Sequence, residues 1–155
     1  VKLTSEGPCI VEIGARMGGD CIHALVQRVY GIDLAQENMR AALEWPVSPE
    51  TPPVGCALSR TLVPEQAGSV HVDERRARSR RTANLIEVVF TKHAGDVVEV
   101  PPVAYDNLAW ISVWGKDYST ARRSLDRRSH RVAGALQILP ADREIHLQHA
   151  DAAGG

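Results

Sequence analysis

Two side chains near the start of the chain could do chemistry together: the carboxylate of Glu12 and the guanidinium of Arg16. If the segment from residue 9 forms a strand, successive side chains point to opposite faces. The odd-numbered positions 9–15 then form one apolar face for a core, and Glu12 and Arg16 share the other face, about 13 Å apart. Gly14 between them has no side chain, so a ligand could approach the backbone there.

This pair has the chemistry of a phosphate and metal site. A carboxylate can hold Mg²⁺, which keeps several waters and takes further ligands from substrate phosphates. A guanidinium can clamp a phosphoryl oxygen or a developing oxyanion through two parallel hydrogen bonds. The alternative is a strand with a solvated polar face, on which the two charged residues only flank a glycine. The spacing alone does not decide between these interpretations.

The sequence of this segment also resembles a known family. Residues 11–20, followed by an amphipathic helix and by Gly-Ile-Asp-Leu at 31–34, resemble the last block of the ATP-grasp ligases, and most of all the carboxylate–amine ligases that include L-amino-acid ligases. The resemblance implies an ATP-dependent ligase in which Glu12 binds Mg²⁺ and Arg16 contacts the transferring phosphoryl group or the intermediate. Many members have Asn where this chain has Gly14, which puts the number of metal ions in question.

Four further residues are candidates for substrate binding. Asp20 is expected to be the N-cap of a helix over residues 20–30. The alternative is that Asp20, with the amides of Gly18 and Gly19, orients an amine substrate. His23 lies one turn into this helix, where a packed or solvent-facing histidine is the simpler interpretation and a role in substrate binding is the other.

Composition narrows the classes of partner. The 155 residues include 18 Lys and Arg against 19 Asp and Glu, for a net charge of −1, so no overall field favours nucleic acid or anionic lipid. No apolar run reaches membrane-spanning length, and no signal peptide opens the chain. We therefore expect a cytoplasmic protein without nucleic-acid or membrane partners, and a homodimer is left open. Cys9 and Cys21 are expected to pack as small reduced hydrophobes.

The expected fold class is α+β. Residues 1–46 would be the C-terminal end of an ATP-grasp catalytic domain built from antiparallel strands and helices, opening with a hairpin of strands 1–4 and 9–15. Residues 47–54, rich in proline, would be a linker or rim loop. Residues 55–140 would form a small α+β C-terminal subdomain, and residues 141–155 a disordered tail. The N-terminal half would also hold a second helix, 34–44, capped by Asp33.

The second half is predicted to hold short strands at 55–63, 68–72, 85–92, 97–100 and 137–139, of which 97–100 should return against 85–92 after a turn at 93–96. Residues 107–114 are apolar on both faces and should be the central strand of their sheet. A helix over 118–136 should bury Ala121, Leu125, Val132 and Leu136, and turn Arg122, Arg123, Arg127 and Arg128 to water. Residues 92–98 and 115–117 in this order also resemble the C-terminal subdomain of the carboxylate–amine ligases, with Asp96 as a turn former.

Other chemistry finds little support in the sequence. The arginines between residues 75 and 81 could bind phosphate or RNA, but a solvated helix or loop is the favoured interpretation. The six histidines have no metal-ligand spacing, and no nucleophile–base pair can be argued from the order of residues.

The sequence therefore predicts part of an ATP-dependent ligase that joins a small carboxylate to an amine, both amino acids by the resemblance, through an acyl phosphate. Mg²⁺ and ATP would be bound largely by upstream sequence, since the chain has the character of a C-terminal fragment. The alternative is a non-catalytic fragment or interaction module with no ATP binding of its own.

Overall fold

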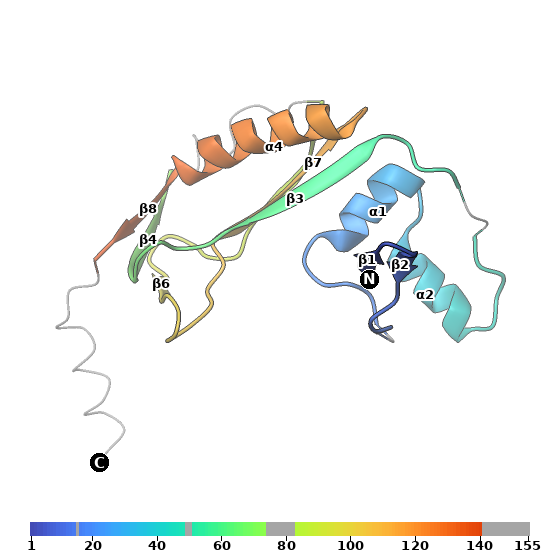
Figure 1. Ribbon diagram of the computed structural model, residues 1–155. Coiled ribbons are helices and arrows are strands. Elements are labelled where there is room, and N and C mark those ends of the chain that lie inside the picture. The colour runs from blue at the N-terminus through green and yellow to red at the C-terminus, as the bar shows by residue number, and fades with distance from the viewer. Residues whose placement is uncertain (15, 49–50, 74–82, 141–155) are drawn as a thin grey trace, which may run out of the picture.

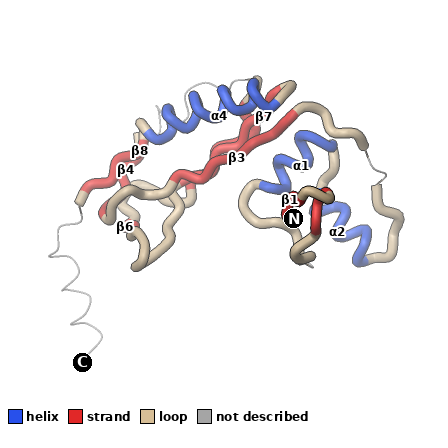
Figure 2. Tube along the Cα trace, viewed as in Figure 1, coloured by secondary structure: helices blue, strands red, loops and turns tan. Residues whose placement is uncertain are grey.

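Two three-stranded antiparallel sheets and one long helix form the second half of the chain (Figures 1 and 2). The computed structural model describes residues 1–14, 16–48, 51–73 and 83–140. The first sheet has the order β3-β7-β5 and the second β6-β4-β8. Their bounds are β3 Cys56–Leu62, β4 Gly68–Val72, β5 Leu85–Phe90, β6 Val97–Val98, β7 Ala109–Gly115 and β8 Leu136–Leu139, and α4 spans Tyr118–Ala133. With the N-terminal helices, this confirms the predicted α+β class.

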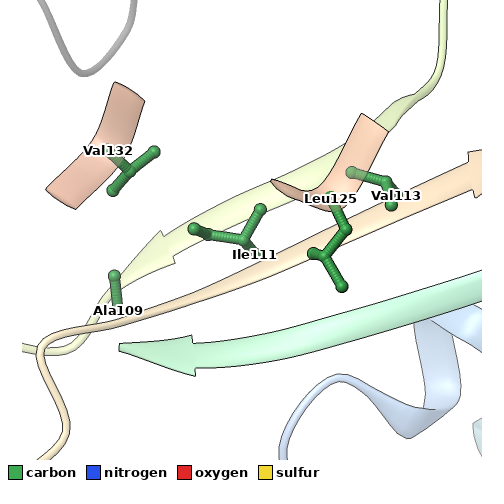
Figure 3. Close-up of a cluster of buried hydrophobic side chains, with 5 residues drawn as sticks. All are labelled: Ala109, Ile111, Val113, Leu125 and Val132. Atoms are coloured by element: carbon green, nitrogen blue, oxygen red, sulfur yellow. The ribbon is translucent and has the colours of Figure 1, made fainter. Parts of the chain in front are cut away.

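The central strand β7 organises the first sheet, as its two apolar faces predicted. Because side chains alternate between the two faces of a strand, Ala109, Ile111 and Val113 all point toward α4. They pack there with Leu125 and Val132 in the main core (Figure 3). All five of these side chains are at most 4% exposed. The core therefore lies between the sheet and α4.

The helix α4 begins at a side-chain cap. One carboxylate oxygen of Asp117 accepts from the backbone N–H of Thr120 at 2.7 Å, and this hydrogen bond lowers the pKa of the Asp117 carboxyl. The helix ends at Ala133, three residues before its predicted end. Leu136 instead opens β8 and pairs with Val72, because the chain turns at Gly134 to rejoin the second sheet.

The second sheet encloses a smaller apolar cluster of Val70, Val98 and Leu108. Residues 97–100 were predicted to return against the strand that begins at residue 85, which is wrong. The short β6 pairs with β4 instead, and the N–H of Gly95 donates to the carbonyl of Val70 at 2.8 Å. Burial of Val98 between β4 and Leu108 explains the choice of partner strand.

The N-terminal part contains a hairpin and two helices: β1 Lys2–Thr4, β2 Gly7–Cys9, α1 Ile22–Tyr30 and α2 Leu34–Ala42. Gly31, with φ +72°, ends α1 and its N–H donates to the carbonyl of Gln27. Asp33 caps α2 by accepting from the N–H groups of Ala35 and Gln36, as predicted. This helix ends at Ala42, two residues before its predicted end.

The predicted strand 9–15 is wrong over most of its length. β2 ends at Cys9, and the two strands of the hairpin join through residues 5–6 alone, with Thr4 paired to Gly7. Residues 10–14 are irregular and exposed. β1 offers three residues for pairing, and no other described strand lies against residues 10–14, so their backbone groups have no ladder to join.

The helix α1 covers the face of the first sheet opposite to α4 (Figure 1). It contacts β3, β7 and β5, and Cys21 just before it is buried as expected. Cys9, by contrast, is exposed, so its predicted packing is wrong. The two helices thus lie on opposite sides of β7.

The proline-rich stretch after α2 runs back along the helices. The backbone N–H and the hydroxyl of Ser48 both donate to Glu37, at 2.7 and 2.6 Å. Farther on, the hydroxyl of Thr51 donates to the carbonyl of Tyr30, and the N–H of Val54 donates to that of Val29. These contacts hold the stretch against α1 and α2, and the domain boundaries predicted around it stay a prediction.

Two predictions lie outside the described residues, namely the arginine-rich run between residues 75 and 81 and the tail 141–155. No described helix combines the length and the apolar character needed to cross a bilayer.

Candidate functional site

Glu12 and Arg16 lie in the exposed segment between β2 and α1. Within the part of the chain that the structure describes, Glu12 makes no hydrogen bond or ion pair. The guanidinium of Arg16 donates from Nη1 to the carbonyl of the next residue, Met17, at 3.0 Å. Both charged groups are therefore open to solvent and to a ligand, although the strand that was predicted to aim them is not formed.

Apolar side chains beside the two charged residues are also uncovered. Ile10, Val11 and Ile13 are 64%, 71% and 83% exposed. The sequence predicted that Val11 and Ile13, with the other odd-numbered positions, would pack into a core, and that prediction is wrong for the described residues. Exposed apolar side chains next to charged groups are typical of an interaction or ligand-binding surface.

The glycines of the segment differ in their surroundings. A Cβ on Gly14 or Gly19 would meet nothing within 4 Å, so both positions have open space. A Cβ on Gly18 would lie 2.9 Å from Cδ1 of Ile22. A side chain at Gly18 would therefore have to displace the end of the Ile22 side chain, the first residue of α1.

Asp20 does not cap α1. The N-cap position belongs to Cys21, which makes no side-chain capping bond, and Asp20 itself adopts φ +55° in the left-handed region. The predicted cap is therefore wrong, because the helix starts one residue later than the sequence suggested. Asp20 and His23 are both exposed. Their role in substrate binding stays a prediction.

The metal chemistry of the segment rests on Glu12 alone. Among the described residues, no group of three or more His, Cys, Asp or Glu side chains gathers in a way that could hold a metal ion. Mg²⁺ does not need such a cage, because it is commonly held by one or two carboxylates together with substrate phosphates and water. A free, exposed carboxylate fits that role as one ligand, and the remaining ligands would have to come from elsewhere.

A second group of polar and charged residues was not predicted from the sequence. Ser124, Arg127, Arg128 and Arg131 line one cavity together with Asn84, which precedes β5. Arg128 was expected to face water and is only 7% exposed, so that expectation is wrong. The spacing i, i+3, i+4, i+7 of the four α4 residues places them on one face of the helix and could have revealed the group.

The chain is similar to proteins of known structure. No family model matches the chain, and no curated relative is found. An L-amino acid ligase from Bacillus licheniformis superposes with a TM-score of 0.68 at 20% identity, covering 91% of this chain and 35% of that one. A phosphoribosylglycinamide synthetase from Anaerococcus prevotii superposes with a TM-score of 0.63 at 18% identity, covering 89% and 35%.

These similarities show the fold. The predicted resemblance to the C-terminal part of ATP-grasp enzymes is confirmed at that level, and the chain spans about a third of the length of both neighbours (35% of each).

Proposed function

We propose that the chain is the C-terminal part of an ATP-dependent ligase that joins a carboxylate to an amine through an acyl phosphate. The observation that carries the proposal is the superposition of 91% of the chain on an L-amino acid ligase. Its support from the residues is the pair Glu12 and Arg16, both exposed and both in the segment that carries the family resemblance. Amino acids are the proposed substrates, and the cytoplasm is the proposed compartment.

Glu12 would hold Mg²⁺ through its carboxylate. The ion, when bound, would neutralise charge on the phosphate oxygens of ATP. Glu12 suits this role because no described residue competes for its oxygens. Gly14 supplies no side-chain oxygen, so this segment alone would contribute one metal ligand.

Arg16 would stabilise negative charge on the transferring phosphoryl group. Its guanidinium has five N–H donors in a fixed fork, of which one engages the carbonyl of Met17. The remaining donors can bind phosphoryl oxygens or the oxyanion that forms when the amine attacks. Gly18, Gly19, Asp20 and His23 would then bind and orient the substrates, with the open space at Gly19 giving access to the backbone.

The rest of the nucleotide site would come from polypeptide beyond this chain. The exposed apolar row at Ile10, Val11 and Ile13 is the surface that this polypeptide would cover, which would also bring its phosphate-binding groups near Glu12. No nucleic acid or membrane takes part in this proposal, and homodimer formation is compatible with it.

The test uses a longer enzyme that contains this chain as its C-terminal part. Glu12→Gln should abolish ADP release and amide formation in the presence of Mg²⁺, ATP and amino acids, while the circular dichroism spectrum stays unchanged. Arg16→Gln should lower the rate of both. Glu6→Gln, an exposed carboxylate of the hairpin turn, is the matched control and should leave the rates unchanged. Normal ADP release by the Glu12 variant would exclude the metal role.

The second candidate is a non-catalytic interaction module. One observation favours it. Five cavities of the described part are lined by residues other than Glu12 and Arg16, so none of these five is a ligand cavity at the candidate site. Calorimetry of Mg-ATP with the 155-residue chain, followed by the activity measurement above in the longer enzyme, separates the two. A longer enzyme without any ATP-dependent condensation would favour the module.

A further inference from the structure

One cavity of the second half is lined by polar side chains of a single charge sign. It has a volume of about 270 Å³ and its lining residues are Asn84, Ser124, Arg127, Arg128 and Arg131. Four of them come from one face of α4, and Asn84 comes from the turn before β5. The lining includes three guanidinium groups and no carboxylate or apolar residue among the described residues. Such a cavity favours an anion over an apolar ligand.

Ser124 provides an independent observation. Its side chain lines this cavity and the residue is only 8% exposed, yet Oγ has no hydrogen-bond partner among the described residues. A buried hydroxyl without a partner is costly, and most buried polar groups in folded proteins are satisfied. An acceptor oxygen in the cavity would supply the missing partner.

The charges in the cavity are crowded. Arg128 is 7% exposed, and its burial together with the charge of Arg131 lowers the pKa of Arg128. Arg128 and Arg131 also have contacts of their own. Asp126, the one acidic residue on α4, is turned to Arg60 and Arg122, at 2.8 and 3.2 Å. It lies outside the lining, so a bound anion would offset the repulsion between the guanidinium groups.

We propose that this cavity is a binding site for a small phosphate-bearing molecule, held by Arg127, Arg131 and the hydroxyl of Ser124. A phosphate group fits better than a single carboxylate because it offers three or more acceptor oxygens to several donors at once. Asn84 is held in place by its own hydrogen bond, in which Nδ2 donates to the carbonyl of Trp114 at 2.8 Å. The amide therefore forms a fixed wall of the site.

The site is distinct from the segment of Glu12 and Arg16. It lies on the face of α4, which covers one side of β7, whereas that segment leads into α1 on the other side (Figure 1). Binding here can therefore be measured whether or not the ligase activity is found.

The experiment is calorimetric titration of the 155-residue chain with inorganic phosphate, pyrophosphate and ADP, at constant ionic strength. Arg127→Gln should weaken binding of the tightest of these about tenfold, the worth of one charge-assisted hydrogen bond. Arg123→Gln is the matched control, since it removes the same charge from the same helix, where the Arg123 guanidinium donates to the hydroxyl of Thr120 and lies outside the cavity lining. It should leave the affinity unchanged.

Ser124→Ala supplies a second measurement. The variant should bind phosphate compounds more weakly, while the ligand-free protein should be no less stable to urea, because an unpartnered buried hydroxyl is removed. If ADP binds more tightly than pyrophosphate, the phosphate group belongs to a nucleotide. If pyrophosphate binds more tightly, the ligand is an inorganic phosphate or another phosphate compound. Equal losses in Arg123→Gln and Arg127→Gln, no binding of any of the three compounds, or tight binding of RNA alone would overturn the proposal.

Discussion

The guanidinium of Arg28 on α1 lies 3.9 Å from the centroid of the Trp114 ring on β7. The indole nitrogen of the same tryptophan donates to the carbonyl of Val54 at 3.1 Å, so Trp114 is held from two sides. Since α1 also contacts β3 and β5, this stacking adds one defined contact between the N-terminal helices and the first sheet. It links the segment that carries Glu12 and Arg16 to the rigid core.

Arg28→Ala should therefore loosen the N-terminal part without unfolding the sheets. A cation–π contact at an exposed site contributes about 0.5–1 kcal/mol. Urea unfolding should show a loss of this size, and hydrogen exchange should rise in α1 while β7 stays protected. Arg123→Ala, which removes an exposed arginine of α4, should change neither measurement. Equal exchange rates in α1 of the wild type and the Arg28 variant would contradict the link.

The elements that the sequence predicted well are those whose signals are local. Residues 107–114 are apolar on both faces and became the central strand, and the helix capped by Asp117 buries Ala121, Leu125 and Val132 as expected. Strand pairing was harder, because Val97 and Val98 have an apolar pattern that fits either neighbour. Only the packed cluster beneath β4 decides which strand they join.

Glu12 and Arg16 were named as site residues from the sequence and their roles stay a prediction, whereas the strand predicted around them is wrong. The types of Glu12 and Arg16 follow from the sequence, and both are accessible as a ligand site requires. The strand expected around them depends on a pairing partner and on a cover for its apolar face, and neither is among the described residues. A strand is stabilised by neighbours that may be distant in the chain, so the alternation of side chains could not establish it. The cap expected at Asp20 also failed, since Asp20 adopts φ +55° and the N-cap position falls on Cys21.

Acid should weaken the fold through Asp106. Its carboxylate lies 2.7 Å from Nζ of Lys92 and accepts from the N–H of Glu99 at 2.9 Å. These contacts lower the pKa of Asp106 below its ordinary value of 3.8, with the hydrogen bond from Lys92 as the largest cause. Since the pKa is lower in the folded state, the stabilisation is fully present above the unfolded value and is lost as the pH falls through the folded value.

Urea unfolding of wild type and Asp106→Asn between pH 7 and pH 2 measures this contribution. The wild type should be the more stable of the two above about pH 4, and the difference should shrink as the pH falls below 3.8. Glu6→Gln, which replaces an exposed carboxylate in the hairpin turn, is the control. The difference in stability between wild type and this variant should not show the same dependence on pH. A difference that grows on acidification would contradict the sign.

Gly68 should be the least replaceable glycine of the second sheet. It has φ +155°, and a Cβ there would lie 2.1 Å from the carbonyl oxygen of Leu139 on β8. Gly68→Ala should destabilise the protein by about 1–3 kcal/mol, the cost of strained backbone together with the displaced strand. Gly14→Ala, where a Cβ meets nothing, should be close to neutral in the same thermal and urea measurements. Equal stability of the two variants would show that β8 is not held in this register.

Gly14 offers a direct test of the metal chemistry proposed for Glu12. A Cβ at Gly14 meets nothing within 4 Å and its φ is outside the left-handed region, so Gly14→Asn should fold with a stability within about 0.5 kcal/mol of wild type. In a longer enzyme, the added amide oxygen two residues from Glu12 should lower the Mg²⁺ concentration needed for half-maximal ADP release, because Mg²⁺ binds carbonyl and carboxylate oxygens. Ser5→Asn, which adds the same amide at an exposed position of the hairpin turn, is the control and should leave the Mg²⁺ dependence unchanged. The same Mg²⁺ dependence in the Gly14 variant and the wild type would place the ion away from this segment, and Glu12 would then need another role.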